Sequence, residues 1–438
     1  MSNLIYAIVT RMCRVLCSVP IGTNRGLFAL LWALMSGRFL HSRGAVFPAL
    51  LAMGLSAEEV RRSEAALAYG HYRTKDLVCA WHQLVLEAGH WQPHRHEGIR
   101  PVACDLTGFF RARLSDCTTK HYASLVEKSL PALVFGLCVS VGSVGNMRLG
   151  LPRLLLRQEN GETEQALQQR LLKEATAGLA SDEALILDGG FLLSDVRALD
   201  GVHFVVRMAQ NASARRNFLP PYCGKGTQPR WGALVRALGR TYAKNKIPPT
   251  PPDCVVTWTE QNRVITAHLY ENLVAANQKP GEKAYRLIVI FDPRYPKPLL
   301  LATNLMLSAE AIWHLYQDRW PVEQLPLAAK QVLGAERSFV FGQQARYRLP
   351  ELALLAGNFL SYAAATAPPV PTGFWDRRSQ PTCGRLRRAL QGSNFLKLIV
   401  PEEQFRKKAS ITDHLPKGVL GHRRKKGENQ TMIARSAA

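Results

Sequence analysis

The sequence predicts an α/β protein, and three observations support this fold class. Its 438 residues are 47 % hydrophobic, which is enough apolar material for a folded interior. Between residues 99 and 210, short apolar runs typical of strands alternate with amphipathic stretches typical of helices. The flanking segments 1–98 and 301–370 instead have the longer apolar periodicity of helices. At roughly 150 residues per domain, a chain of this length corresponds to two or three domains.

The N-terminal 98 residues are predicted to be helical. Short breaks at Gly37 and Gly54 separate three apolar-periodic segments, which comprise residues 27–37, 45–54 and 56–68. Ser56 is placed to cap the third of them, because a serine side chain accepts a hydrogen bond from the first free backbone amides of a helix.

Two short helices joined by a glycine-containing turn can form a helix-turn-helix that contacts DNA. In that case the residues that face phosphates are Arg61, Arg62 or Arg73. A small helical bundle packed on the core is the alternative interpretation of the same segment.

Residues 99–210 have the pattern of a sheet with two crossing helices. The predicted strands are 102–106, 132–141, 147–157, 184–188 and 203–208, and the predicted helices are 162–177 and 192–199. The first three strands form a meander. This order, three strands followed by a helix, a strand, a helix and a strand, is that of an RNase H-like sheet.

The remaining chain divides by composition. Proline-rich stretches at 217–222 and 247–253 precede strand-like runs at 254–259, 264–269 and 285–292, which indicates a β-rich insertion. Helices resume at 308–334 and 349–367. We therefore predict five regions: a helical, DNA-binding N-terminal domain (1–98), the first part of the RNase H-like core (99–210), the β-rich insertion (211–300), the second part of the core (301–370) and a basic C-terminal region (371–438).

The charge of the chain indicates a polyanionic partner. Lys and Arg number 56 against 33 Asp and Glu, so the formal net charge is +23. Nucleic acid and an anionic membrane surface both fit that balance. The last 68 residues alone contain 15 basic and five acidic residues, which predicts phosphate binding without sequence preference in this region. Interleaved apolar residues there, including Leu390, Phe395 and Ile399, predict an amphipathic helix.

Several classes of protein are excluded by what the sequence lacks. The longest apolar stretches fall short of the ~20 residues that a membrane-spanning helix needs, and Arg11 and Arg14 interrupt the apolar N-terminus. The nine cysteines include no CxxC pair, so neither a disulfide framework nor a zinc ribbon is indicated. GxxxxGK[ST] and GxGxxG motifs are absent. A reducing, cytoplasmic setting follows as the simplest expectation.

Two aspartates stand out because they lie in apolar strands. Asp105 falls within Val-Ala-Cys-Asp-Leu-Thr, and Asp188 ends Leu-Ile-Leu-Asp-Gly-Gly-Phe. A buried carboxylate is costly unless it is paired or holds a metal ion. If the two strands are parallel neighbours, the carboxylates converge at one end of the sheet, where they suit Mg²⁺ or Mn²⁺. An aspartate that caps a following helix is the alternative for either strand alone.

A second signal comes from the segment Tyr-Gln-Asp-Arg-Trp-Pro-Val-Glu-Gln-Leu-Pro-Leu-Ala-Ala-Lys, residues 316–330. On one continuous helix, Tyr316, Arg319, Glu323 and Lys330 share an arc of about 60°. Basic groups and a phenol around one carboxylate suit phosphate clamps beside a metal ligand. A solvated face of salt bridges is the alternative.

This Tyr-x2-Arg-x3-Glu-x6-Lys spacing resembles the signature of a large subgroup of DDE transposases from bacterial insertion sequences. The motifs Asp-x-Thr at Asp105 and Asp-x-Gly-Phe at Asp188 are similar too, as is a strand that ends in Arg207. The resemblance spans roughly residues 25–365. It implies an RNase H-like core with a catalytic, metal-binding triad of Asp105, Asp188 and Glu323.

The resemblance also implies an activity and its partners. It implies Mg²⁺-dependent DNA cleavage, with Mn²⁺ as a substitute, at the terminal inverted repeats of a mobile element, followed by transfer of the freed 3′ end to target DNA. Matched position by position, the residues that contact the DNA are Tyr316, Arg319, Trp320 and Lys330. We expect double-stranded DNA and a second copy of the chain as partners, no membrane, and a location at the bacterial nucleoid in the cytoplasm.

Some members of that family stack an unpaired base on an aromatic residue of the insertion. Trp258 and Tyr295 are the candidates here, and ordinary packing within a sheet is the alternative for both.

Pro326 departs from the family pattern, because proline removes a backbone donor and can kink a helix interior. Pro321 is harmless if it begins a new helix. An inactive copy that binds its ends as a repressor therefore stays an alternative, as does an RNase H-like site-specific nuclease without strand transfer. The cluster of His90, His94, His96 and Glu97 contains residue types that bind zinc, but a solvated linker is the preferred interpretation.

Overall fold

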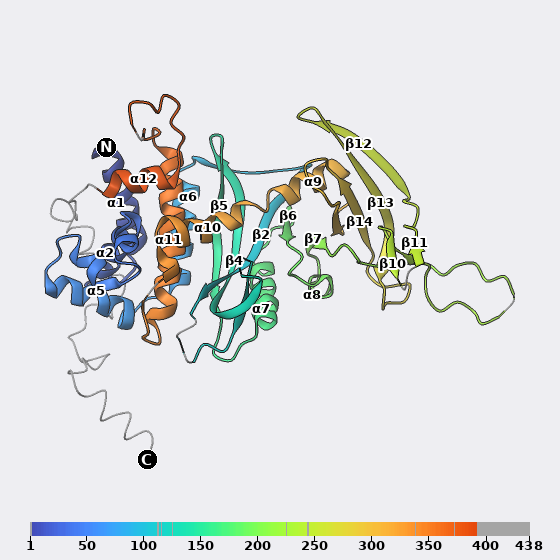
Figure 1. Cartoon of the computed structure of the whole chain (residues 1–438), viewed down its shortest axis with the longest axis horizontal. Helices are drawn as coiled ribbons and strands as arrows, with labels where there is room; N and C mark the ends of the chain where they lie inside the picture. Colours follow the sequence, from blue (N-terminus) through green and yellow to red (C-terminus); the bar gives the residue numbers. More distant parts are fainter. Residues whose placement is uncertain are drawn as a thin grey trace, which may run out of the picture.

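A large mixed β-sheet runs through the molecule, with helices packed at one end and long strands at the other (Figure 1). The structure, a computed structural model, describes residues 2–391 apart from residues 112, 113, 115, 125, 225, 243, 244, 338 and 372. The chain is therefore an α/β protein, as its sequence predicts.

The centre of the sheet contains five strands in the order β5-β4-β2-β6-β7. They are β2 (Arg100–Phe110), β4 (Lys128–Val144), β5 (Met147–Arg157), β6 (Glu183–Leu187) and β7 (His203–Met208). The pairs β5–β4 and β4–β2 are antiparallel, whereas β2–β6 and β6–β7 are parallel. All five strands and the meander of the first three were predicted.

Each parallel connection passes through a helix. Helix α7 (Glu164–Thr176) links β5 to β6, and α8 (Leu193–Arg197) links β6 to β7. The side chain of Thr163 caps α7 by accepting a hydrogen bond from the backbone N–H of Ala166 at 3.2 Å. Buried leucines of α7, including Leu167 and Leu171, pack in one hydrophobic cluster with residues of the sheet. Both helices agree with the sequence prediction.

The insertion continues the central sheet instead of forming a sheet of its own. Strand β15 (Leu299–Thr303) pairs with β7, and β14 (Tyr285–Phe291) and β13 (Arg263–Ala275) follow. The periphery adds β1 (Trp91–Pro93), β3 (Lys120–Ala123), β8 (Ala214–Arg216), β9 (Leu234–Val235) and β12 (Cys254–Glu260), while β10 (Arg240–Tyr242) and β11 (Asn245–Ile247) pair with each other. The three predicted insertion strands correspond to β12, β13 and β14.

The N-terminal segment is helical, as predicted. Its helices are α1 (Ser2–Leu16), α2 (Thr23–Met35), α3 (Arg38–His41), α4 (Val46–Leu51), α5 (Ala57–Tyr69) and α6 (Thr74–Glu87). Gly37 and Gly54 have φ angles of 74° and 79°, which other residues rarely adopt, so these positions end the preceding helices. Ser56 caps α5, and Glu59 completes a capping box.

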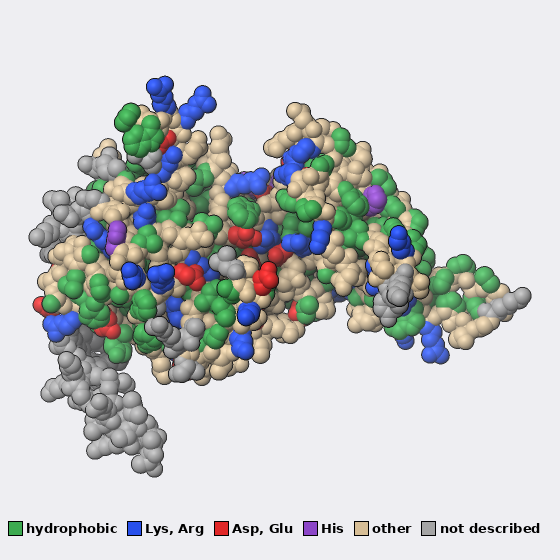
Figure 2. All heavy atoms as spheres, in the orientation of Figure 1, with side chains coloured by type: hydrophobic (Ala, Val, Ile, Leu, Met, Phe, Trp, Pro, Cys, Tyr) green, Lys and Arg blue, Asp and Glu red, His purple; other side chains and the backbone are tan. Residues whose placement is uncertain are grey.

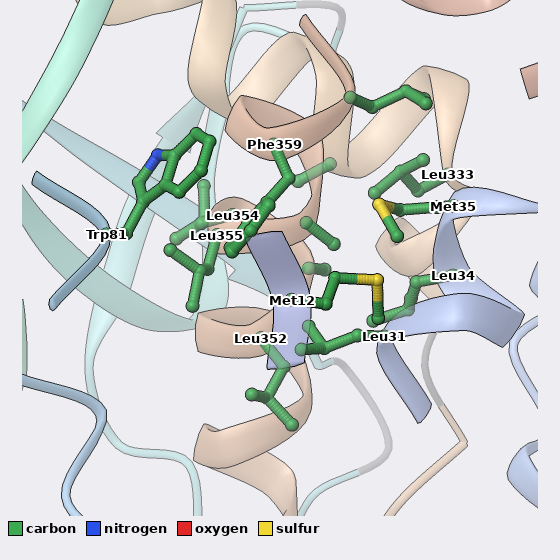
Figure 3. Close-up of a cluster of buried hydrophobic side chains, with 14 of the residues drawn as sticks. Met12, Leu31, Leu34, Met35, Trp81, Leu333, Leu352, Leu354, Leu355 and Phe359 are labelled. Carbon is green, nitrogen blue, oxygen red and sulfur yellow. The ribbon is translucent and has the colours of Figure 1, made fainter. Parts of the chain in front are cut away.

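These helices share one hydrophobic core with α11 (Ala345–Thr366) from the far end of the sequence. Figure 3 shows Met12 and Leu31 of the N-terminal helices close to Leu352 of α11. The indole N–H of Trp81 in α6 donates to the side chain of Asn358 at 2.7 Å. The N-terminal helices are thereby fixed against the part of the chain that carries Glu323.

One prediction about residues 308–334 is wrong. They do not form a single helix: α9 (Ala309–Gln317) ends before Arg319, and α10 (Pro321–Leu327) begins after it. Pro321 is the first residue of α10, where its missing N–H is harmless. Pro326 lies inside α10, and the chain continues as a π-helical turn (Ala328–Val332) and a 3₁₀ turn (Ala335–Arg337).

The basic C-terminal region is described only as far as residue 391. Helix α12 (Cys383–Gln391) buries Leu386 and Leu390, which agrees with the predicted amphipathic helix. The expectations for residues 392–438, including the roles of Phe395 and Ile399, lie outside the described residues. Within the described part of the chain, no helix is both long and apolar enough to cross a membrane.

Candidate active site

The two predicted aspartates are neighbours at the carboxyl end of β6, beside the middle of the parallel strand β2. Cys104 of β2 lies opposite Leu187 of β6 in the register of the sheet. Asp105 and Asp188 are the next residue of each strand, so they occupy adjacent positions where β6 ends. Carboxyl ends of parallel strands are a common place for ligand binding in α/β proteins. The condition under which the two carboxylates were expected to converge, a parallel pairing of their strands, is therefore met.

Arg319 links Asp105 to Glu323. One guanidinium nitrogen of Arg319, Nη1, lies 3.2 Å from Oδ2 of Asp105, and Nη2 donates to Oε1 of Glu323. The Arg319 side chain is only 12 % exposed. Glu323 comes from the first turn of α10, which packs against β2, β4 and β5. Three carboxylates from three separate elements therefore gather around one arginine.

Asp188 has two further partners. The Tyr316 hydroxyl donates to its Oδ1 at 3.0 Å, and Arg207 Nη1 lies 3.3 Å from the same oxygen. Arg207 is on β7 and was noted in the sequence only through the family resemblance. The pairing of β6 with β7 brings it to Asp188.

The carboxylate cluster, defined as Asp105, Asp188 and Glu323, is incompletely neutralised. Burial raises the pKa of Asp105 to about 6, and repulsion from the other two carboxylates adds to this effect while Arg319 opposes it. For Asp188, burial alone raises the pKa, but Arg319, the backbone N–H of Gly189 and Arg207 outweigh it and lower the pKa. Burial and the nearby Asp188 raise the pKa of Tyr316 to about 12.

The residues present suit a hard divalent cation. Three carboxylates that repel one another supply the oxygen ligands that Mg²⁺ and Mn²⁺ prefer. Among the described residues, no group of three His, Cys, Asp or Glu side chains is arranged as a metal site, and the Arg319 guanidinium bonds both Asp105 and Glu323. The three carboxylates therefore match the predicted metal in the type of their donor atoms, but not in their present arrangement.

Lys330 does not join this cluster. Its ammonium group donates to the backbone carbonyl of Gly108 at 2.6 Å and lies 5.0 Å from the ring centre of Phe109. Burial lowers its pKa. A continuous helix would place Lys330 on the same face as Arg319, but the helix break and the π-helical turn change that direction. The expectation of one shared helix face is therefore wrong for this residue.

A basic and aromatic cavity adjoins the carboxylate cluster. Its volume is about 750 Å³. Figure 2 shows acidic side chains in the hollow between the two halves of the molecule, with Lys and Arg side chains on both sides. The cavity is lined by Arg148, Arg207, Gln210, Arg294, Tyr295, Pro296, Lys297, Pro298, Leu299, Trp313, Tyr316, Gln317, Arg319 and Trp320.

Trp320 and Tyr295 are half-exposed in this cavity, at 52 % and 51 %. Trp258 instead packs against a hydrophobic cluster of the sheet. Of the two insertion aromatics considered from the sequence, Tyr295 is therefore the one beside the carboxylate cluster.

The histidine-rich segment is only in part a solvated linker, since His90 and Glu97 are exposed but His94 and His96 are half-buried. His94 and His96 are each 22 % exposed, and both donate to Oδ2 of Asp318, at 2.9 and 2.7 Å. Although burial raises the pKa of Asp318, these two hydrogen bonds hold it at about 2. Asp318 lies more than 200 residues away in the sequence, so no local pattern indicates this contact.

No protein-family model matches this sequence, and no curated protein matches it significantly. The function must therefore be argued from the residues of the site.

Proposed function

We propose that this chain is a DDE transposase, which cleaves transposon-end DNA and joins the freed 3′ end to target DNA by metal-dependent phosphoryl transfer. The observation that carries this proposal is the convergence of Asp105, Asp188 and Glu323 around Arg319. The strand order β5-β4-β2-β6-β7, with the last three strands parallel, supports an RNase H-like core.

Asp105, Asp188 and Glu323 would hold Mg²⁺, or Mn²⁺ in its place. When bound, such ions activate the attacking oxygen and stabilise the leaving oxygen of an in-line displacement. The chain's own residues orient the ligands: Arg319 holds Asp105 and Glu323, and Tyr316 holds Asp188. These contacts limit the freedom of the carboxylates before substrate arrives.

The cavity beside the cluster suits a DNA strand. Arg207, Arg294 and Lys297 offer charge to phosphates, and Trp320 and Tyr295 offer exposed rings on which bases can stack. Stacking of this kind contributes about 1–3 kcal/mol per base. The net charge of +23 also favours a polyanionic partner. Double-stranded DNA at the inverted repeats and the target is thus the proposed substrate, with two chains acting on two ends at the bacterial nucleoid.

The deciding experiment uses purified full-length protein with labelled DNA that carries the flanking inverted repeats. With Mg²⁺ we expect cleavage at the repeat boundary and joined products with target DNA, and with EDTA we expect neither. Matched DNA with a scrambled repeat is the control.

Cleavage without joining would indicate a site-specific nuclease of the same fold. Binding to the repeats without cleavage, in protein shown by circular dichroism to be folded, would indicate the repressor alternative that Pro326 suggests. If the folded protein neither binds nor cleaves this DNA, the proposal is overturned.

A further inference from the structure

The corner between α9 and α10 carries the residues that organise the proposed site. Tyr316 is near the end of α9, Glu323 is in the first turn of α10, and Arg319 lies between the helices. In one continuous helix the hydrogen-bond ladder would fix the relative directions of these side chains. Because the helix is interrupted, another constraint must set them.

The backbone of the corner makes shorter-range bonds than an α-helix. The N–H groups of Arg319 and Trp320 donate to the carbonyls three residues earlier, at 3.1 and 3.4 Å, and Glu323 does the same at 3.0 Å. Such turns have poorer hydrogen-bond geometry than the α-helix. The backbone alone is thus a weak constraint on the angle between α9 and α10.

Asp318 fastens this corner to another part of the fold. Its side chain is only 2 % exposed, and one of its oxygens accepts hydrogen bonds from His94 and His96. The other oxygen lies 3.8 Å from Nη1 of Arg148 on β5. The next residue in the chain, Arg319, contacts Asp105 and Glu323.

The segment that bears the two histidines is itself fixed. The backbone N–H of His94 donates to Val141 of β4 at 3.0 Å, and His96 exchanges two backbone hydrogen bonds with Ile99, both at 2.9 Å. Glu97 accepts a hydrogen bond from the backbone N–H of Ser308, the N-cap residue of α9, at 3.1 Å. Residues 94–97 therefore hold α9 at both of its ends.

We propose that His94, His96 and Asp318 are positioning residues, which hold the α9–α10 corner so that Arg319 and Glu323 face Asp105. The effect on the metal site rests on the proposed function, whereas the anchoring of the α9–α10 corner does not depend on it. A buried ionic group usually adds little stability over an apolar side chain of the same size, and its direction-dependent bonds can instead specify one arrangement. Asp318 is well placed for this role, because it directly precedes Arg319 in the chain.

The first test measures hydrogen–deuterium exchange of the full chain without metal. In Asp318→Ala, and in a double variant with His94→Ala and His96→Ala, we expect the amides of residues 316–323 to exchange about tenfold faster or more. Glu351→Gln is the matched control, because Glu351 is a buried carboxylate of α11 that bonds Arg157 and Thr74. It should leave exchange in the corner unchanged.

The second test measures Mn²⁺ affinity by calorimetry on the same proteins. Loss of an outer-shell partner typically weakens metal binding about 10- to 100-fold, and we expect a loss in this range for both alanine variants. A double variant with His94→Asn and His96→Gln places an amide N–H group close to the position of each ring nitrogen that contacts Asp318. It should restore most of the affinity, and Glu351→Gln should keep the wild-type value.

The outcomes separate the two proposals. A folded Asp318→Ala protein with unchanged exchange in the corner overturns the anchoring, and faster exchange with wild-type Mn²⁺ affinity overturns the positioning role. If Asp318→Ala does not fold, Asp318→Asn, which keeps the size of the side chain, takes its place in both tests. If the wild type itself neither binds Mn²⁺ nor cleaves DNA, the proposed function fails, and the exchange data still decide the anchoring.

Discussion

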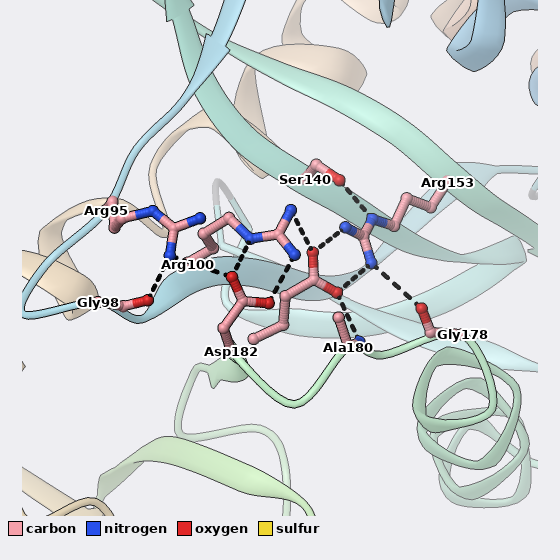
Figure 4. Close-up of polar contacts among 9 residues, drawn as sticks. Arg95, Gly98, Arg100, Ser140, Arg153, Gly178, Ala180 and Asp182 are labelled. Carbon is pink, nitrogen blue, oxygen red and sulfur yellow. Dashed lines mark hydrogen bonds and ion pairs between the residues drawn. The ribbon is translucent and has the colours of Figure 1, made fainter.

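The short strand β6 has a charged cluster at each end, both shared with its neighbour β2, and the two clusters differ in their balance of charge. At the amino ends, Arg100 bonds Asp182 at 2.9 and 2.7 Å, and Arg153 donates to Glu183 at 2.8 Å. Figure 4 shows this amino-end cluster, in which Arg95 also lies close to Asp182. Three arginines therefore face two carboxylates.

At the carboxyl end of β6, beside the middle of β2, the balance of charge is reversed. Asp105, Asp188 and Glu323 face Arg319 and Arg207. Burial raises the pKa of Asp105 to about 6 there, whereas the Arg100 bonds hold the pKa of Asp182 at about 2. Carboxylates that are fully paired with arginines stabilise the sheet, whereas carboxylates with too few positive partners attract a cation. This contrast supports the proposal that the functional site lies beside Asp105 and Asp188.

The largest effect should come from removing one charge of the carboxylate cluster. We expect Asp105→Asn, Asp188→Asn and Glu323→Gln each to lower the DNA cleavage rate about 1,000-fold or more, because a metal ligand contributes several kcal/mol to catalysis. End binding, measured by mobility shift, should stay close to wild type. Asp182→Asn, at the opposite end of the strands, is the control. Equal losses in the control would show that the two clusters do not differ in function.

The next effect concerns the stability of the amino-end cluster. Arg153→Ala leaves the Glu183 carboxylate, which is only 3 % exposed, with Arg100 as its remaining arginine partner at 3.2 Å. We expect the free energy of unfolding to fall by about 3 kcal/mol, measured by urea denaturation. Arg207→Ala at the other end removes a half-exposed partner, and should cost about 1 kcal/mol or less. Similar losses in both variants would contradict the comparison.

A smaller effect of opposite sign is expected at Asp105. Because its raised pKa means that the folded protein disfavours the charged form, Asp105→Asn should stabilise the metal-free protein by about 1 kcal/mol at pH 7. Glu183→Gln should destabilise it, since the lowered pKa of Glu183 shows that its arginine bonds outweigh its burial. Thermal unfolding in EDTA measures both changes. A loss of stability in Asp105→Asn would contradict the account of incomplete neutralisation.

The smallest effect is a dependence on acid pH. The pKa of Asp182 is 3.8 for the free group and about 2 in the folded protein, with the Arg100 hydrogen bond as the chief lowering cause. Its contribution to stability is therefore complete above about pH 4 and disappears as the pH falls from 4 to 2. Urea unfolding of wild type and Asp182→Asn across this range should show two curves that converge toward pH 2. Parallel curves would show that Asp182 contributes nothing through its charge.

Much of the fold was predictable because local patterns are strong in buried strands. The apolar runs around Asp105 and Asp188 predicted β2 and β6, and their pairing followed from the order of strands and helices. The prolines at 321 and 326 indicated a break between Tyr316 and Lys330, but the direction that Lys330 takes after this break depends on tertiary contacts. Spacing arguments assume one continuous helix, and two prolines break that assumption.

Other features had no local signal. The histidines at 94 and 96 contact Asp318 only because the chain between β1 and β2 passes the end of α9. The continuation of the central sheet into the insertion depends on the short strand β15, which the sequence analysis did not identify.

The sequence by itself determined the class of fold, a basic α/β chain with a meander followed by parallel strands, and it singled out three acids as candidates for a metal site. Only the tertiary structure decided which charges meet. Arg207 reaches Asp188, Asp318 receives two histidines, and Lys330 turns to Gly108. The physical reason is that strand periodicity is encoded over a few residues, whereas the balance of charge around a buried carboxylate depends on side chains brought together from distant parts of the chain.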